Sequence, residues 1–199
     1  MLQGGGSPPW NIRVRWSAGI GYDAGMRIFL IGPMGSGKTA VGRAVARVLN
    51  LKFIDTDTEI EERTGVDIPF IFEKEGEEGF RVREREVIAD LTQQPDVVLA
   101  TGGGAILSQD SRRLLAERGF VVYLEASIER QLERTRTGRH RPLLNTEDPR
   151  ARLEELMQHR EPLYREIAQL AVSTDGRRVQ AVAEAIIAAL PAQGSRSGP

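Results

Sequence analysis

Short apolar segments and longer amphipathic segments alternate along this chain of 199 residues. We predict that the apolar segments are strands, at residues 26–31, 53–54, 97–100, 120–124 and 171–173. Between them, apolar residues recur at helical spacing, as Val41, Ala44, Val45 and Val48 do. This pattern predicts helices over 40–50, 57–64, 68–93, 111–118, 127–133, 149–169 and 179–190.

A strand that is apolar on both sides is typical of a parallel sheet with helices on both faces. The alternation therefore predicts one α/β domain over 26–190, with three layers and a central five-stranded parallel sheet. Ligands of such sheets bind where the strands end, at the carboxyl edge. The residues directly after each strand are thus the first candidates for a functional site.

The two ends of the chain lack this periodicity. Residues 1–25 are rich in glycine, and we predict a disordered leader or an expression tag there, with Met26 as a plausible natural start. Residues 191–199 are predicted to form a disordered tail. Residues 1–25 lack the basic and apolar parts of a secretory signal, and no apolar run approaches the roughly 18 residues of a membrane span.

The composition excludes several classes of function. The 27 Lys and Arg residues nearly balance the 28 Asp and Glu residues, which argues against a general nucleic-acid or membrane-surface binder. The chain has no cysteine, so disulfides, thiolate metal sites and cysteine nucleophiles are excluded. The basic residues are almost all arginine, with only Lys38, Lys52 and Lys74 as lysines. Genomic base composition explains most of this bias.

A phosphate-binding sequence follows the first predicted strand. Residues 32–39 read GPMGSGKT, which matches G-x-x-x-x-G-K-[ST] between a strand and a helix. Its glycines let successive N–H groups point at phosphate oxygens, and the helix adds the positive end of its dipole. Lys38 is expected to reach the β- and γ-phosphates and Thr39 to bind Mg²⁺. The candidate nucleotide-binding residues here are Gly35, Ser36, Gly37, Lys38, Thr39 and Ala40.

Three further segments follow strands or connect helices. Asp55 and Asp57 suit a division of tasks, in which one carboxylate holds a magnesium-bound water and the other orients or deprotonates an acceptor hydroxyl. An Asp at this position also suits a helix N-cap, and one residue can do both. The glycines 102–104 allow a close backbone approach to a ligand, or form a tight turn. The arginine-rich residues 130–142 suit a mobile lid over a triphosphate, or a solvated loop. From spacing alone, the side chains of Arg81 and Arg160 are expected to lie on the protein surface.

Six segments, taken together and in order, resemble the shikimate kinase family. They are GPMGSGKT (32–39), DTD (55–57), GEEGFR (76–81), LATGGGAI (99–106), RPLL (141–144) and REPLY (160–164). The first is common to many nucleotide-binding proteins, whereas the combination with the other five is much more specific. The resemblance covers roughly residues 26–190 and implies a P-loop kinase fold. It also implies a helical substrate-binding insertion at about 57–93 and a mobile lid at about 134–147.

The resemblance implies transfer of the ATP γ-phosphoryl group to the 3-hydroxyl of shikimate, in aromatic amino-acid biosynthesis. Asp57 would contact the ring hydroxyls and act as the base, and Gly103 would offer a backbone contact. Arg81 and Arg160 would bind the shikimate carboxylate, which suits the planar fork of arginine. Glu84 lies one helical turn after Arg81 and is expected to hold its guanidinium.

On the nucleotide side, the resemblance implies ATP with Mg²⁺ as cofactors. Asp55 would bind Mg²⁺ through water beside Thr39, and Arg141 of the lid would reach the transferred phosphoryl group. Arg134 would lie against adenine, near Arg177 or Arg178. The implied partners are the small molecules shikimate and ATP, with no nucleic acid and no membrane, and the implied form is a cytoplasmic monomer.

Two other functions stay open at this point. One is a kinase for another small hydroxylated acid, such as gluconate. The other is a nucleotide-binding regulatory protein without catalysis, which the presence of Lys38, Thr39, Asp55, Asp57 and Arg141 argues against.

Overall fold

The computed structural model describes residues 25–136 and 148–191. The strands are β1 (Arg27–Ile31), β2 (Lys52–Asp55), β3 (Val97–Ala100), β4 (Phe120–Glu125) and β5 (Leu170–Ser173). The helices are α1 (Lys38–Leu49), α2 (Thr56–Thr64), α3 (Ile68–Leu91), α4 (Gln109–Arg118), α5 (Ile128–Thr135), α6 (Pro149–Ile167) and α7 (Val179–Ala189). A short 3₁₀ helix, η2 (Ala105–Leu107), precedes α4.

The strands form one parallel sheet in the order β2-β3-β1-β4-β5. The central strand β1 pairs with β3 on one side and with β4 on the other, and its successive residues Ile28, Phe29 and Leu30 are fully buried. The chain order reverses across β1, and such switch points are where ligands bind in parallel sheets. The loop that follows β1 therefore lies at the predicted functional edge.

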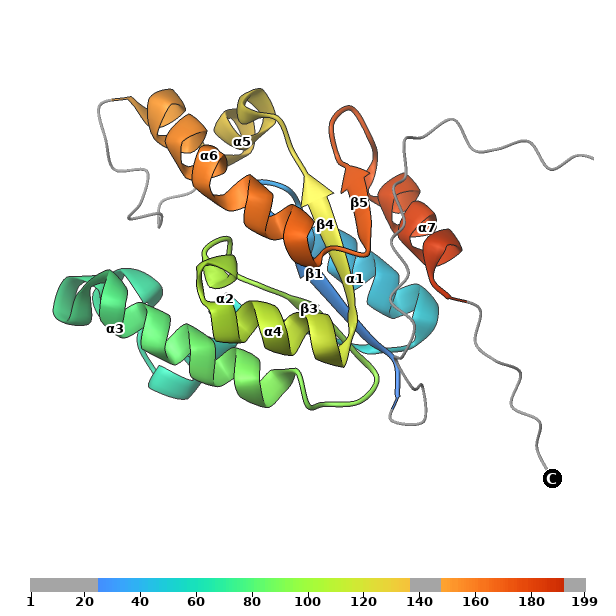
Figure 1. The fold of residues 1–199 in the computed structure, drawn as a ribbon, viewed down its shortest axis with the longest axis horizontal. Helices are drawn as coiled ribbons and strands as arrows, with labels where there is room; N and C mark the ends of the chain where they lie inside the picture. The colour runs from blue at the N-terminus through green and yellow to red at the C-terminus, as the bar shows by residue number, and fades with distance from the viewer. Residues whose placement is uncertain (1–24, 137–147, 192–199) are drawn as a thin grey trace, which may run out of the picture.

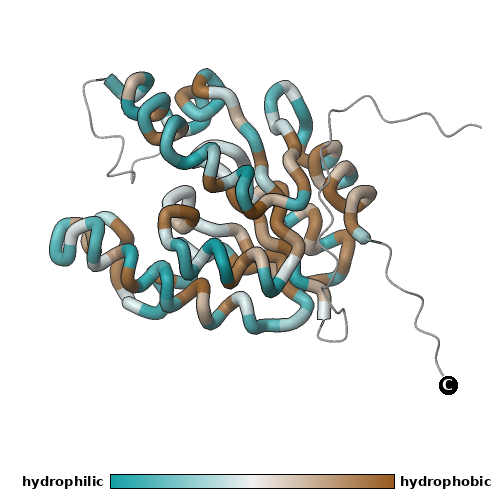
Figure 2. The backbone as a smooth tube through the Cα atoms, in the orientation of Figure 1, coloured by the Kyte–Doolittle hydropathy of each residue, from teal (hydrophilic) through white to brown (hydrophobic). Residues whose placement is uncertain are grey.

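Helices cover both faces of the sheet (Figure 1). Ile28 and Leu30 pack with α1 and α7 on one face, whereas Phe29 and Ile31 pack with α3, α4 and α6 on the other. Figure 2 shows hydrophobic residues along the strands and along the helix faces turned toward them. The predicted three-layer α/β fold with a central five-stranded parallel sheet is thus confirmed.

Local sequence explains where several helices begin. The side chains of Ser108, Ser127 and Asp148 each accept a hydrogen bond from the backbone N–H three residues on, at the starts of α4, α5 and α6.

The prediction of one helix over 68–93 was wrong at Gly76, where φ is 71° and ψ is −175°. That conformation is almost exclusive to glycine, so the residue splits α3 into two helical parts.

Several predicted segments lie outside the described residues. They are residues 1–24 of the leader, residues 137–147 of the lid with Arg141, and residues 192–199 of the tail. Over the described ranges, no helix is both long enough and apolar enough to cross a membrane.

Candidate active site

A cavity of about 550 Å³ lies at the carboxyl edge of the sheet. Five predicted segments contribute to it: the phosphate loop, the residues after β2, the glycines after β3, helix α3 and helix α6. The site residues that the sequence predicted and that line it are Gly35, Gly37, Lys38, Thr39, Ala40, Asp55, Asp57, Arg81, Gly103, Arg134 and Arg160. The structure therefore brings most of the predicted site together.

The phosphate loop has the curled backbone that its glycines predict. Gly35 and Gly37 adopt φ angles of 76° and 90°, a conformation that other residues rarely adopt. Ser36 is completely buried, and α1 begins immediately after Gly37. The Lys38 ammonium group donates hydrogen bonds of 2.8 Å to the carbonyls of Gly32 and Pro33. This lysine therefore lies folded across the mouth of the loop.

Asp55 joins the phosphate loop to α2. Its Oδ2 accepts a hydrogen bond of 2.7 Å from the Thr39 hydroxyl, and its Oδ1 accepts one of 3.1 Å from the backbone N–H of Asp57. It is thus both the helix N-cap and a neighbour of the predicted metal-binding hydroxyl, as the sequence allowed.

These oxygens suit a magnesium ion. Mg²⁺ is usually held by one or two protein oxygens together with substrate phosphates and waters, and Thr39 and Asp55 supply a hydroxyl and a carboxylate beside the phosphate loop. Across the described residues, no three or more His, Asp or Glu side chains gather in a way that would hold a metal ion.

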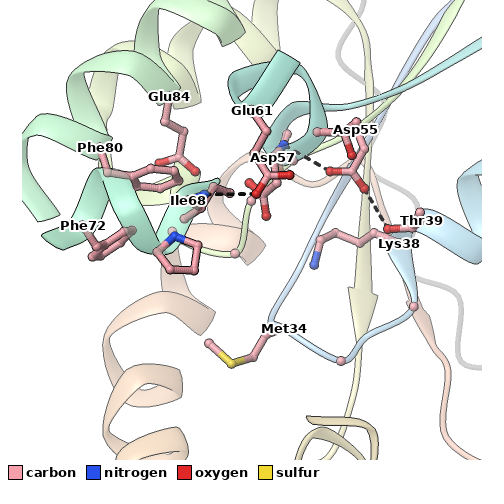
Figure 3. Close-up of a pocket in the computed structure, with 18 of the residues that line it drawn as sticks. Met34, Lys38, Thr39, Asp55, Asp57, Glu61, Ile68, Phe72, Phe80 and Glu84 are labelled. Atoms are coloured by element: carbon pink, nitrogen blue, oxygen red, sulfur yellow. Dashed lines mark hydrogen bonds between the residues drawn. The ribbon is translucent and has the colours of Figure 1, made fainter. Parts of the chain in front are cut away.

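Asp57 is a carboxyl group of the cavity with a raised pKa. Burial raises its pKa to about 7, and the negative charges of Asp55 and Glu84 act in the same direction. Its Oδ1 is buried and has no hydrogen-bond partner among the described residues. Figure 3 shows Asp57 beside Asp55 and near Lys38. A carboxyl group with these properties can exchange a proton near neutral pH.

Two arginines meet in the cavity from different helices. Arg81 of α3 donates a hydrogen bond of 2.6 Å to Glu84, which is 2% exposed, and one of 2.8 Å to Glu77. The expectation that Glu84 holds this guanidinium is confirmed. Arg160 of α6 is 4% exposed, and among the described residues it forms no ion pair. Neither arginine lies on the surface, so the prediction from spacing alone was wrong.

The three glycines pass so close to these groups that a side chain at Gly102 or Gly104 would have to displace them. A Cβ atom on Gly102 would lie 2.5 Å from Glu84 Oε1 and 2.8 Å from Asp57 Oδ1. One on Gly104 would lie 2.3 Å from the Arg81 guanidinium. A Cβ atom on Gly103 would face the phosphate loop, 3.3 Å from the backbone nitrogen of Met34. The segment is therefore packed tightly against protein groups of the cavity, and its close approach to a ligand stays a prediction.

Sequence reasoning missed the apolar wall of the cavity. Ile68, Pro69 and Phe72 line it from the first part of α3, and Phe80 lines it from the second (Figure 3). The Phe72 and Phe80 rings lie 4.9 Å apart between centroids. Only the position of Phe80, directly before Arg81, could have drawn attention to it.

The two arginines predicted near adenine lie in different places. Arg134 lines the cavity and donates a hydrogen bond of 2.8 Å to the Gly35 carbonyl. Arg177 lies in the loop between β5 and α7, where it donates a hydrogen bond of 3.1 Å to the Ala181 carbonyl, and it does not line the cavity.

The Glu84 anchor gives a first testable expectation. Glu84→Ala should lower the free energy of unfolding by about 3 kcal/mol, because it leaves the Arg81 guanidinium without its buried partner. Glu77→Ala removes the half-exposed partner of the same arginine and should cost about 0–1 kcal/mol. Urea unfolding of both variants measures the difference. Equal losses would contradict the role of Glu84 as the anchor.

Comparisons with known proteins agree with this architecture. A family model described as shikimate kinase matches residues 34–191. A shikimate kinase of Methylococcus capsulatus is 56% identical over 169 residues, which cover 85% of this chain and 94% of the relative. One of Hahella chejuensis is 49% identical and covers 96% of each chain.

Solved structures show the same similarity. A shikimate kinase from Acinetobacter baumannii in complex with shikimate has a TM-score of 0.81 and 48% identity, covering 83% of this chain and 93% of that one. A deoxyadenosine kinase from M. mycoides, 15% identical with a TM-score of 0.55, shares the fold alone. With a family model that covers most of its length and close relatives that cover nearly all of it, the chain belongs to the shikimate kinase family.

Proposed function

We propose that this protein transfers the γ-phosphoryl group of ATP to the 3-hydroxyl of shikimate, giving shikimate 3-phosphate and ADP. The observation that carries the proposal is the Arg81 and Arg160 pair, which lines the same cavity as the phosphate loop. Arg160 is buried, and burial together with the charge of Arg81 lowers its pKa. A carboxylate bound between the two guanidiniums relieves both effects.

The acceptor side of the cavity fits a small cyclic acid. The two arginines take its carboxylate, the wall of Phe72 and Phe80 takes its apolar ring atoms, and Asp57 takes its hydroxyls. Gly103 lies between Arg160 and the phosphate loop and offers its backbone to the ligand. This division into a cationic end, an apolar side and an acidic side selects a hydroxylated acid with a fixed orientation.

The nucleotide side uses the phosphate loop. The backbone N–H groups of 35–40 and the start of α1 take the phosphates, and Lys38 leaves its loop carbonyls for the β- and γ-phosphates. Arg134 is proposed for the adenine side, together with Arg177 of the loop between β5 and α7. Arg141 is proposed to reach the transferred group, and it lies outside the described residues.

The reaction depends on alignment and charge. Phosphoryl transfer has a loose transition state with charge spread over the phosphoryl oxygens, so positioning and electrostatics supply most of the rate. Asp57 orients the acceptor hydroxyl and takes its proton. Lys38 stabilises negative charge on the transferred group. Mg²⁺, held beside Thr39 and Asp55 with the ATP phosphates, supplies further charge neutralisation when bound.

A coupled assay of ADP release tests the proposal. Turnover should depend on added shikimate and should be at least a hundredfold slower with gluconate, whose open chain does not fill the apolar wall. ADP release with gluconate and none with shikimate would overturn the proposed substrate. ATP binding without release for either acid would instead favour a regulatory role.

The raised pKa of Asp57 predicts the pH profile. At saturating ATP and Mg²⁺, kcat/KM for shikimate should fall about tenfold per pH unit below 7 and level off above it, because the base acts only when ionised. The same shift makes the free energy of unfolding decrease as pH rises from about 4 to 7, since the folded chain holds a proton that the unfolded chain has released. A profile that stays flat down to pH 5 would remove Asp57 as the base.

The proposed form is a monomer in the cytoplasm. The absence of cysteine is compatible with a reducing compartment. Size-exclusion chromatography with light scattering tests the monomer, for which the expected mass is 22.0 kDa.

A further inference from the structure

The carbonyl of Gly103 is held by side chains rather than by the backbone. The carbonyls of Gly102 and Gly104 accept hydrogen bonds from the backbone N–H groups of Ala105 and Leu107, as is usual in a 3₁₀ turn. The Gly103 carbonyl instead accepts a hydrogen bond of 2.5 Å from the Tyr164 hydroxyl. The middle glycine of the segment is therefore tied to α6.

Arg160 competes for the same carbonyl. It lies one turn before Tyr164 on α6, and its guanidinium donates to the Gly103 carbonyl at 3.5 Å, a distance at the limit of a hydrogen bond. The shorter bond from Tyr164 satisfies the carbonyl. The charged groups of Arg160 are thereby left available to a ligand instead of being used on the backbone.

Tyr164 is well placed to hold this arrangement firmly. Its side chain is 1% exposed, and its ring stacks on that of Tyr123 of β4, with centroids 4.9 Å apart and planes inclined by 18°. Burial raises the pKa of its hydroxyl, which stays protonated and remains a donor at neutral pH. Because the Tyr164 ring and its hydroxyl are both held in place, the direction of the Gly103 carbonyl is held as well.

The direction of that carbonyl matters for the whole site. The peptide group is planar, so fixing the Gly103 carbonyl also fixes the N–H of Gly104, which points the opposite way. The glycine segment packs closely enough that a Cβ on Gly102 would meet Asp57 and Glu84, one on Gly103 the phosphate loop, and one on Gly104 the Arg81 guanidinium. A rotation of this one peptide would therefore disturb the acceptor half of the cavity.

We propose that Tyr164 is a positioning residue, which holds the Gly103 carbonyl so that Arg160 stays free to bind the substrate carboxylate. The proposal rests on the proposed function, since it concerns binding of shikimate. Tyr164 does not act on the reacting atoms. It acts through Arg160 and through the orientation of the glycine segment.

The test compares Tyr164→Phe with Tyr123→Phe. The first variant removes the hydroxyl that binds Gly103, and the second removes a hydroxyl from the other ring of the same stack and keeps the Gly103 bond. We expect Tyr164→Phe to raise the KM for shikimate about tenfold, with kcat and the KM for ATP changed less than threefold. Tyr123→Phe should leave all three constants within twofold of wild type.

Each outcome has a defined meaning. If wild type does not turn over shikimate, the proposed function fails, and the proposal for Tyr164, which rests on it, is overturned with it. If wild type turns it over and both variants keep a normal KM while losing thermal stability, Tyr164 is only structural and the proposal is overturned.

A binding measurement tests the proposal in the case that the Tyr164→Phe protein does not fold. In Tyr123→Phe protein labelled with 3-fluorotyrosine, the only labelled positions are Tyr22 and Tyr164. Shikimate should shift the fluorine resonance of Tyr164, identified as the resonance that remains when Tyr22 is also replaced by phenylalanine. A resonance that saturating shikimate does not move would overturn the proposal.

Discussion

Replacing Asp57 by asparagine is expected to lower kcat by about 10²–10⁴-fold, the range of general base catalysis. Asparagine keeps the size of the side chain but cannot take the proton of the acceptor hydroxyl. It also removes a carboxyl group whose pKa burial raises to about 7, so the acidic limb of the pH profile should disappear. Initial rates of ADP release across pH 5–9 measure both effects.

Glu61→Gln is the matched control for this variant. Glu61 lies one turn later on α2, lines the same cavity, and accepts a hydrogen bond of 3.0 Å from the backbone N–H of Ile68 (Figure 3). Its loss of charge should change kcat less than threefold. The affinity for ATP, measured by calorimetry, should be close to wild type in both variants. A near-normal kcat in Asp57→Asn would remove Asp57 from the mechanism.

Arg160→Lys should raise the KM for shikimate by about 10–100-fold while leaving the KM for ATP within about twofold of wild type. An ammonium group cannot bind a carboxylate with two parallel hydrogen bonds. In this buried position beside Arg81, it also loses its proton more readily than a guanidinium does. Steady-state kinetics with each substrate varied in turn separate the two constants.

Arg165→Lys controls for the general exchange of arginine on α6. The Arg165 side chain is 50% exposed and pairs with Glu125 and Glu161, away from the cavity lining. Its replacement should leave both KM values unchanged. If Arg160→Lys behaved in the same way, Arg160 would not bind the carboxylate.

The parts of the fold that depend on local pattern could be predicted from the sequence. Continuous apolar strands, such as Val97–Ala100, indicated a covered parallel sheet, and the phosphate loop fixed the functional edge. The pairing of Arg81 with Glu84 also follows from helical spacing. These features could be predicted because they depend on residues that are near one another in sequence or on a pattern that repeats along one element.

The missed features depend on contacts between distant segments. Nothing near Arg160 in sequence shows that it is buried against Gly103, because that contact spans 57 residues. The contact between the Phe72 and Phe80 rings depends on the break at Gly76, which periodicity cannot reveal. Roles that depend on ATP, Mg²⁺ and the lid, including that of Arg141, remain predictions.

The buried arginine pair also affects the stability of the protein and therefore its lifetime in the cell. Two guanidiniums that repel each other in a desolvated cavity lower the stability of the ligand-free chain, as sites selected for binding often do. A bound anion removes that cost and shifts the folding equilibrium by mass action. The cellular abundance of the protein would then follow the supply of its substrate, because proteases act on the unfolded fraction.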